Sequence, residues 1–103
     1  MAVKVDRYEG TSIKRDKLYF GGASVASLAK EFGTPLYVID EGVFRERCRA
    51  YREAFESRYS PVTVLLASKA LMIPAIARNA WQEGLGLDVA STGELEGGVL
   101  GGV

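Results

Sequence analysis

Lys69 is the residue of this sequence best suited to covalent chemistry. It lies in an otherwise almost wholly apolar run, VLLASKAL, over residues 64–71. An ammonium group is costly to bury without a partner, so either the side chain reaches water at the end of a strand or the site uses an amine. A neutral lysine amine attacks aldehydes to form a Schiff base. The run is therefore compatible with a lysine that binds a carbonyl compound and with one that turns outward to water.

Asp88 lies near the end of the next predicted strand. If the two strands are adjacent and parallel, about 4.8 Å apart, their ends lie side by side and Lys69 and Asp88 share one rim. Ligands of parallel α/β folds bind at that rim. Apolar walls favour the neutral amine, whereas a neighbouring carboxylate favours the charged form, so the two effects compete. The pattern alone favours a simpler alternative, in which Lys69 turns outward and meets an acidic neighbour.

Ser91 and Glu94 form the pattern S-x-x-E directly before an apolar residue. This spacing is typical of a capping box, in which the hydroxyl and the carboxylate each bind a free amide at the start of a helix. The spacing favours that structural role, although Glu94 could still face the ligand rim.

Other candidates are weaker. GLGLDV has Val89 where a dinucleotide-binding fingerprint needs its third glycine, so that motif fails. Cys48 lies on the apolar stripe of a predicted helix, and the sequence has no histidine to activate it, so we expect a core residue. Trp81 is likewise expected to serve packing. Four charged residues of the same predicted helix are expected to form a solvated face: Glu46, Arg49, Arg52 and Glu53.

The elements that must position these residues follow from hydrophobic periodicity and turn residues. Strands are predicted over 17–20, 34–40, 62–67 and 85–90, and helices over 25–32, 41–59 and 72–83, with a further helix opening at Ser91. From residue 40 onward helices and strands alternate with short connections, which predicts an α/β fold with parallel strands. The strand over 62–67 lacks polar alternation, so we expect both its faces to be covered.

The predicted sheet is too small to be complete. Two buried parallel strands leave exposed edges with unpaired backbone groups, so the chain is predicted to open a larger domain. The C-terminal stretch GELEGGVLGGV carries several glycines, each of which weakens a helix by about 1 kcal/mol relative to alanine. We therefore expect the chain to stop in an element against which nothing packs.

Composition excludes several classes of function. The chain has 103 residues, 48% of them hydrophobic, and its 13 basic and 13 acidic residues balance, so no charge points to nucleic acid or an anionic membrane. One cysteine and no histidine rule out an internal disulfide and argue against structural zinc. Residues 1–10 lack the apolar core of a secretory signal, and no apolar run approaches the roughly 20 residues that cross a bilayer. A cytoplasmic protein is predicted.

Three segments in order, FGTPLYVID, LLASKAL and GLGLDVASTGEL, resemble diaminopimelate decarboxylase and the wider group of pyridoxal-phosphate decarboxylases with an alanine-racemase-like barrel. In that family the lysine of a Y-A-x-K-A motif holds the cofactor covalently. The matching residue is Lys69, flanked by Ala67 and Ala70, and Ala67 is expected at the cofactor site with it. Leu66 stands where the family usually has an aromatic residue.

The family's D-V-x-S-x-G-E motif matches the residues from Asp88 to Glu94. The resemblance places Asp88 beside the cofactor lysine and makes Glu94 a further member of the cofactor site. Thr92 stands where glycine is common.

The resemblance also implies a fold and a reaction. Residues 41–103 would form the first units of a (β/α)8 barrel of the TIM type, and residues 1–40 would contribute to a second, β-rich domain. The implied reaction is the pyridoxal-phosphate-dependent decarboxylation of meso-diaminopimelate to L-lysine in a homodimer, with the rest of the site outside this chain. Related ornithine, arginine and carboxynorspermidine decarboxylases are alternatives, as is a truncated, non-catalytic module that pairs its open sheet edge with a partner. Alone, the 103-residue chain is expected to be inactive.

Overall fold

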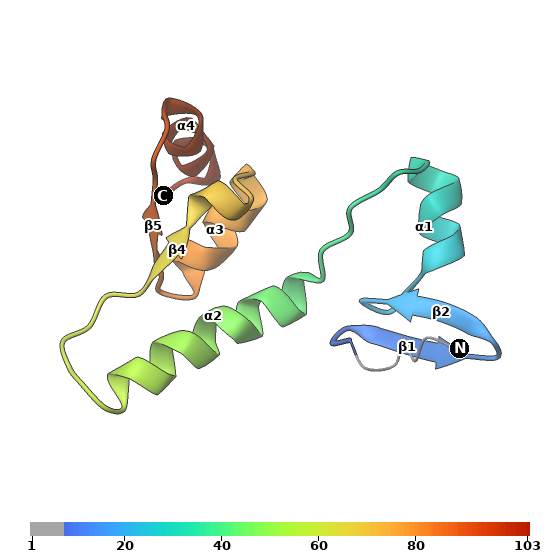
Figure 1. Ribbon diagram of the computed structural model, residues 1–103, viewed down its shortest axis with the longest axis horizontal. Coiled ribbons are helices and arrows are strands. Elements are labelled where there is room, and N and C mark those ends of the chain that lie inside the picture. Colours follow the sequence, from blue (N-terminus) through green and yellow to red (C-terminus); the bar gives the residue numbers. More distant parts are fainter. Residues whose placement is uncertain (1–7) are drawn as a thin grey trace. The chain divides into compact units, whose positions relative to one another are not determined.

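The computed structural model describes residues 8–103, which form a mixed α/β structure (Figure 1). Residues 1–7, which hold most of the stretch predicted to lack a secretory signal, lie outside the described residues. The chain forms two compact units that divide between Phe44 and Arg45, called here the first and the second unit. In chain order the elements are β1 (Thr11–Lys14), β2 (Lys17–Phe20), β3 (Ala23–Ser24), α1 (Val25–Phe32), α2 (Glu41–Glu56), β4 (Leu65–Ala67), the 3-10 turn η2 (Ser68–Ala70), α3 (Pro74–Gln82), β5 (Gly86–Asp88) and α4 (Thr92–Gly101).

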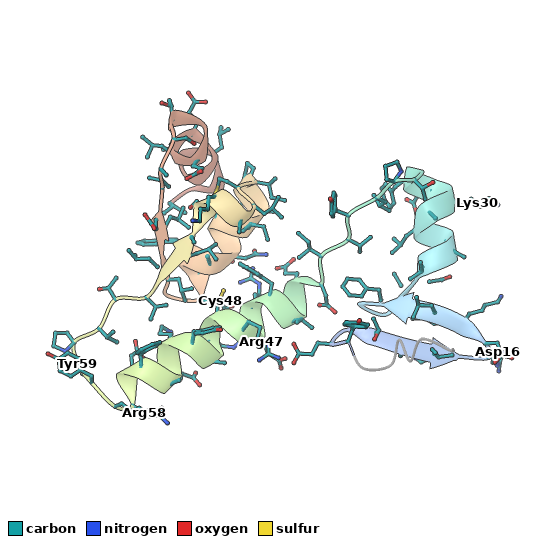
Figure 2. All side chains as sticks on the ribbon, viewed as in Figure 1. Asp16, Lys30, Arg47, Cys48, Arg58 and Tyr59 are labelled. Carbon is teal, nitrogen blue, oxygen red and sulfur yellow. The ribbon has the colours of Figure 1, made fainter. Side chains whose placement is uncertain are left out.

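The first unit begins with an antiparallel sheet in the order β1-β2-β3. Its first turn uses Arg15 and Asp16, which both have positive φ, and Figure 2 shows Asp16 at the tip of this hairpin. The sequence predicted β2 but missed β1 and β3. Two-residue hairpin turns are recognised by residues such as Asn-Gly, which adopt positive φ readily, and Arg-Asp carries no such signal.

Helix α1 confirms the helix predicted over 25–32. Ser24 is its N-cap, and the Ser24 hydroxyl accepts a hydrogen bond from the amide of Ser27 at 3.4 Å. Gly33 ends the helix with a φ of 80°, and its amide donates to the carbonyl of Ala29. Such a left-handed φ favours glycine, which explains why the helix stops there.

The strand predicted over 34–40 is wrong. These residues form no strand, and the apolar side chains of Leu36–Ile39 are exposed, that of Tyr37 fully. β-propensity describes how well a side chain fits a pleated, half-buried surface, so a strand also needs a neighbour. Within residues 8–103 no strand pairs with this segment.

The second unit contains the predicted parallel pair. β4 and β5 lie side by side, with Leu65 opposite Gly86 and Ala67 opposite Asp88, and α3 connects them (Figure 1). The strands have three residues each and are shorter than predicted. The expectation that both faces are covered is also wrong, because the Leu65 residue keeps 53% of its surface exposed. Within the described residues, the layers that would cover this sheet are incomplete.

Helix α4 corrects the expectation that nothing packs against the last element. Helix α4 packs on α3, and three of its glycines are buried: Gly97, Gly98 and Gly101. A Cβ atom added at Gly101 would lie 2.7 Å from the carbonyl oxygen of Pro74 and 2.9 Å from Cβ of Ala77. Gly101 therefore costs helix propensity but lets α4 approach α3 closely, whereas Gly97 and Gly98 lie against Met72 and Leu87.

Helix α2 confirms the predicted solvated face for Glu46 and Glu53, which are exposed, and corrects it for Arg49 and Arg52, which are half-buried. Glu83, at the end of α3, binds two arginines of α2, with Arg45 Nη1 at 3.0 Å and Arg49 Nη1 at 2.8 Å. Arg45 Nη2 also donates to the side-chain oxygens of Asn79 and Gln82. These contacts fasten α2 to α3.

The core prediction for Cys48 is confirmed, whereas that for Trp81 is not. Cys48 is buried, on the side of α2 that faces α3 (Figure 2). Burial raises the pKa of its thiol, and the nearby Glu83 carboxylate acts in the same direction, so the thiol stays protonated and unreactive. Trp81 keeps 54% of its surface exposed.

Replacing Glu83 with glutamine should make the second unit less stable, and the loss should depend on pH. Hydrogen bonds from Arg45 and then Arg49 hold the pKa of Glu83 below its ordinary value of 4.5. A carboxylate with a lowered pKa stabilises the fold fully above its unfolded-state pKa, and this stabilisation is lost as the pH falls through the folded-state pKa.

Urea unfolding of wild type and Glu83→Gln at several pH values tests this. The difference in free energy of unfolding should be largest above pH 4.5 and should shrink below it. A difference that does not change with pH would show that charge plays no part. Glu53→Gln is the matched control, because Glu53 lies 4.0 Å from its arginine and is far more exposed.

Candidate functional site

The candidate site lies at the carboxyl ends of β4 and β5. Lys69 follows the last residue of β4 by two positions, inside η2, and its side chain is exposed. The 3-10 turn ends the strand and lets the amine reach solvent. Lys69 therefore lies just beyond the carboxyl end of β4, where the sequence predicted it.

Asp88 is the last residue of β5, where it is exposed and stands opposite Ala67 in the parallel register. The two strand ends therefore meet, as the sequence predicted for a shared rim. Within residues 8–103 no hydrogen bond or ion pair joins Lys69 to Asp88. The structure brings the two residues to one edge of the sheet and leaves both side chains accessible to a ligand.

Ser68, which the sequence analysis did not single out, is buried directly before the exposed Lys69. It is 1% exposed, and its hydroxyl has no hydrogen-bond partner within the described residues. Its apolar neighbours in the sequence were the available signal, since a small polar residue in such a run is often buried. Ser68 fills the interior while Lys69 reaches the surface.

Glu94 caps the helix that follows the rim. Ser91 is the N-cap of α4, and its hydroxyl accepts from the amide of Glu94 at 3.2 Å. The Glu94 carboxylate accepts in turn from the amide of Ala90 at 2.7 Å. The predicted capping role is confirmed, with Ala90 as the amide partner one residue before the cap. Through this bond Glu94 orders the loop that follows Asp88.

Replacement of Ser91 and of Ser68 by alanine should change the free energy of unfolding of the second unit differently. Ser91→Ala removes an N-cap bond and should lower the free energy of unfolding by about 1 kcal/mol. Ser68→Ala removes a buried hydroxyl with no partner in the described residues, so it should be neutral or stabilising, by up to about 1 kcal/mol. Urea unfolding of both variants measures the difference. A clear destabilisation by Ser68→Ala would mean that the hydroxyl is satisfied in solution.

The residues at the rim fit a cofactor that carries an aldehyde. Lys69 offers an exposed primary amine, and Asp88 offers a carboxylate at the neighbouring strand end. An amine and a carboxylate are the groups needed to bind a carbonyl carbon and to exchange protons beside it. Within the described residues no group of acidic, cysteine or histidine side chains could hold a metal ion.

An apolar pocket of about 310 Å³ lies elsewhere, in the first unit. Its lining includes Leu18, Val25 and Leu28 but no titratable side chain, so it offers no catalytic chemistry. Across residues 8–103, none of the helices combines the length and the apolar character required to span a bilayer.

Comparisons with known proteins agree with the family resemblance. No protein-family model matches the chain. A diaminopimelate decarboxylase of Synechocystis sp. is 45% identical over 83 residues, which are 80% of this chain and 18% of the relative. A diaminopimelate decarboxylase of Bacillus subtilis is 44% identical over 85 residues, 82% of this chain and 19% of the relative. The chain thus spans about a fifth of the curated relatives that it matches.

Solved structures give the same result for the fold. AQ1208 from Aquifex aeolicus superposes on this chain with a TM-score of 0.79 at 34% identity. The superposition covers 91% of this chain and 23% of the AQ1208 chain. Diaminopimelate decarboxylase from M. jannaschii, in a complex with L-lysine, superposes on this chain with a TM-score of 0.75 at 30% identity. The superposition covers 92% of this chain and 23% of that decarboxylase. The predicted resemblance to diaminopimelate decarboxylases is confirmed over most of the chain.

Proposed function

We propose that this chain, which resembles about a fifth of a diaminopimelate decarboxylase, carries the cofactor-binding lysine of such an enzyme, a pyridoxal-phosphate-dependent amino-acid decarboxylase. One observation carries the proposal: Lys69 and Asp88 lie at the carboxyl ends of two adjacent parallel strands, with Asp88 opposite Ala67. This is the edge at which parallel α/β enzymes hold their ligands. The similarity to named decarboxylases supports the choice of reaction.

We propose the fold of the complete enzyme from the resemblance to this family. Residues 41–103 contribute the first strand-and-helix units of a (β/α)8 barrel, and residues 1–40 contribute to a second, β-rich domain. The parallel β4 and β5 with α3 between them form one such unit. The enzyme is a cytoplasmic homodimer, and the short chain alone is inactive.

The reaction is the conversion of meso-diaminopimelate to L-lysine and carbon dioxide, in which a proton replaces the departing carboxylate. Pyridoxal phosphate supplies, when bound, a sink for the electrons released at the α-carbon. Lys69 would hold the cofactor through Nζ, and Asp88 would place a carboxylate at the neighbouring strand end. Ala67 leaves room at the rim because its side chain is a single methyl group, and Glu94 orders the loop after Asp88.

A chimera tests the proposal. The segment of this chain that matches the Bacillus subtilis relative replaces the corresponding segment of that enzyme. The chimera is expected to release carbon dioxide from meso-diaminopimelate and to restore growth of a lysine auxotroph. Preference for ornithine, arginine or carboxynorspermidine instead would move the chain to a related decarboxylase. A well-folded chimera that decarboxylates none of these substrates would leave the non-catalytic interaction module as the better hypothesis.

A further inference from the structure

We propose that Arg52 is a positioning residue for the rim that holds Lys69 and Asp88, because it fixes the turn from which β5 starts. The inference rests on the proposed function. It concerns a residue that lies away from the rim but supports the geometry that the function needs. Arg52 lies on α2, and the turn that it holds connects α3 to β5.

Arg52 contacts the turn at two points. Its Nε donates to the carbonyl oxygen of Glu83, the C-cap residue of α3, at 3.0 Å. Its side chain also covers Gly84, where an added Cβ would lie 3.1 Å from Arg52 Cδ. Gly84 has a φ of 84°, so this turn needs glycine. A cation at the C-terminus of a helix is also favoured by the helix dipole.

The position of Asp88 depends on this turn because the strand pair is short. β4 and β5 pair over three residues each, and β5 begins two residues after Gly84. The amide of Gly86 donates to the carbonyl of Val64 at 3.0 Å at the start of the pair. A shift of one residue in the register would turn Asp88 to the opposite face of the sheet. Fixing the turn therefore fixes the face on which Asp88 stands.

The neighbouring arginines bind the side chain of Glu83, whereas Arg52 binds its backbone carbonyl. Arg45 and Arg49 thus hold the helix. Among residues 8–103, Arg52 is the residue whose side chain bonds to the backbone of the turn itself. A second contact of Arg52, from Nη1 to Glu56 Oε2 at 3.0 Å, lies on the surface of α2 and offers a control.

The first readout is the strand register in the 103-residue chain. Nuclear Overhauser contacts between β4 and β5 should place Ala67 opposite Asp88 in wild type. Arg52→Met should weaken or shift these contacts, whereas Arg52→Lys, which keeps a cationic donor, should restore most of them. Glu56→Gln should leave them unchanged, because the bond to the turn remains. If Arg52→Met does not fold, Arg52→Gln, which is shorter and uncharged, takes its place.

The second readout is the reactivity of Lys69 toward pyridoxal phosphate in the chimera, where the Bacillus subtilis relative supplies the part of the site that lies outside this chain. The amine condenses with the aldehyde, water leaves, and borohydride supplies the hydride that reduces the carbon–nitrogen double bond. Mass spectrometry then gives the ratio of modified Lys69 to modified Lys30, an exposed lysine of α1 in the first unit. Arg52→Met should lower this ratio roughly tenfold, since misplacement of a reacting group by about 1 Å can cost a hundredfold.

The outcomes separate this inference from the function on which it rests. If Lys69 reacts no faster than Lys30 in the chimera that keeps Arg52, the proposed function fails. If that chimera prefers Lys69 and Arg52→Met changes neither the register nor the ratio, the role of Arg52 is overturned. An equal fall of the ratio in Glu56→Gln also overturns it, because the effect would then come from the surface of α2.

Discussion

Replacing Lys69 with alanine in the chimera is expected to lower decarboxylation of meso-diaminopimelate by about a thousandfold or more. The proposed function gives this amine the covalent contact with the cofactor, and losses of that size or larger follow the removal of a nucleophile. Release of carbon dioxide from labelled substrate measures the rate. Because Lys69 is exposed just after β4, its replacement should not impair folding, and a folding defect would not explain such a loss.

Two controls sharpen this result. Lys30→Ala removes an equally exposed lysine from α1 and should leave the rate within about twofold, as expected for a surface substitution that touches no site. Lys69→Arg keeps the positive charge but replaces the primary amine with a guanidinium that cannot condense with the aldehyde, so it should be as inactive as Lys69→Ala. Full activity of either Lys69 variant would remove the lysine from the mechanism.

Replacing Gly101 with alanine is expected to destabilise the second unit by about 1–3 kcal/mol, the usual cost of inserting a methyl group into a well-packed interface. The new Cβ would lie 2.7 Å from the backbone oxygen of Pro74, which cannot rotate away as a flexible side chain would. Helices α3 and α4 would have to separate. The loss should appear in urea unfolding as a lower midpoint with an unchanged slope.

Gly93→Ala is the matched control in the same helix. A Cβ at Gly93 meets no atom within 4 Å, and its φ is not in the left-handed region. Alanine exceeds glycine in helix propensity by about 1 kcal/mol, so Gly93→Ala should be neutral or stabilising. The two substitutions are chemically identical, and a similar effect of both on stability would contradict the close packing of α3 and α4.

The sequence predicted those helices whose ends are marked by local capping residues. Helix α1 begins after the Ser24 cap and ends at Gly33, and α4 begins after Ser91, as expected from the sequence. What failed depends on neighbours distant in the chain. Residues 34–40 have strand propensity, but no strand of residues 8–103 pairs with them, and Gly101 weakens α4 as a helix yet fits closely against α3.

The site was predicted in part for the same reason. The adjacency of Lys69 and Asp88 followed from alternating helices and strands, because that pattern dictates parallel neighbours whose carboxyl ends meet. The ion pairs of Glu83 with Arg45 and Arg49 could not be predicted from the sequence, because these arginines lie 34 or more residues before Glu83. Pairing between charged side chains of different helices leaves no periodic trace in the sequence.

The exposed segment Leu36–Ile39 has a consequence for handling the protein. Four consecutive exposed apolar residues, with which no strand of residues 8–103 pairs, could pair with the same segment of a second copy, as exposed edge strands do when they aggregate. Pro35 and Asp40 flank the segment and act as gatekeepers, because proline lacks an amide donor and a charge opposes stacking. Aggregates of the isolated chain should therefore grow from this segment, and low temperature and low protein concentration should keep the chain dispersed.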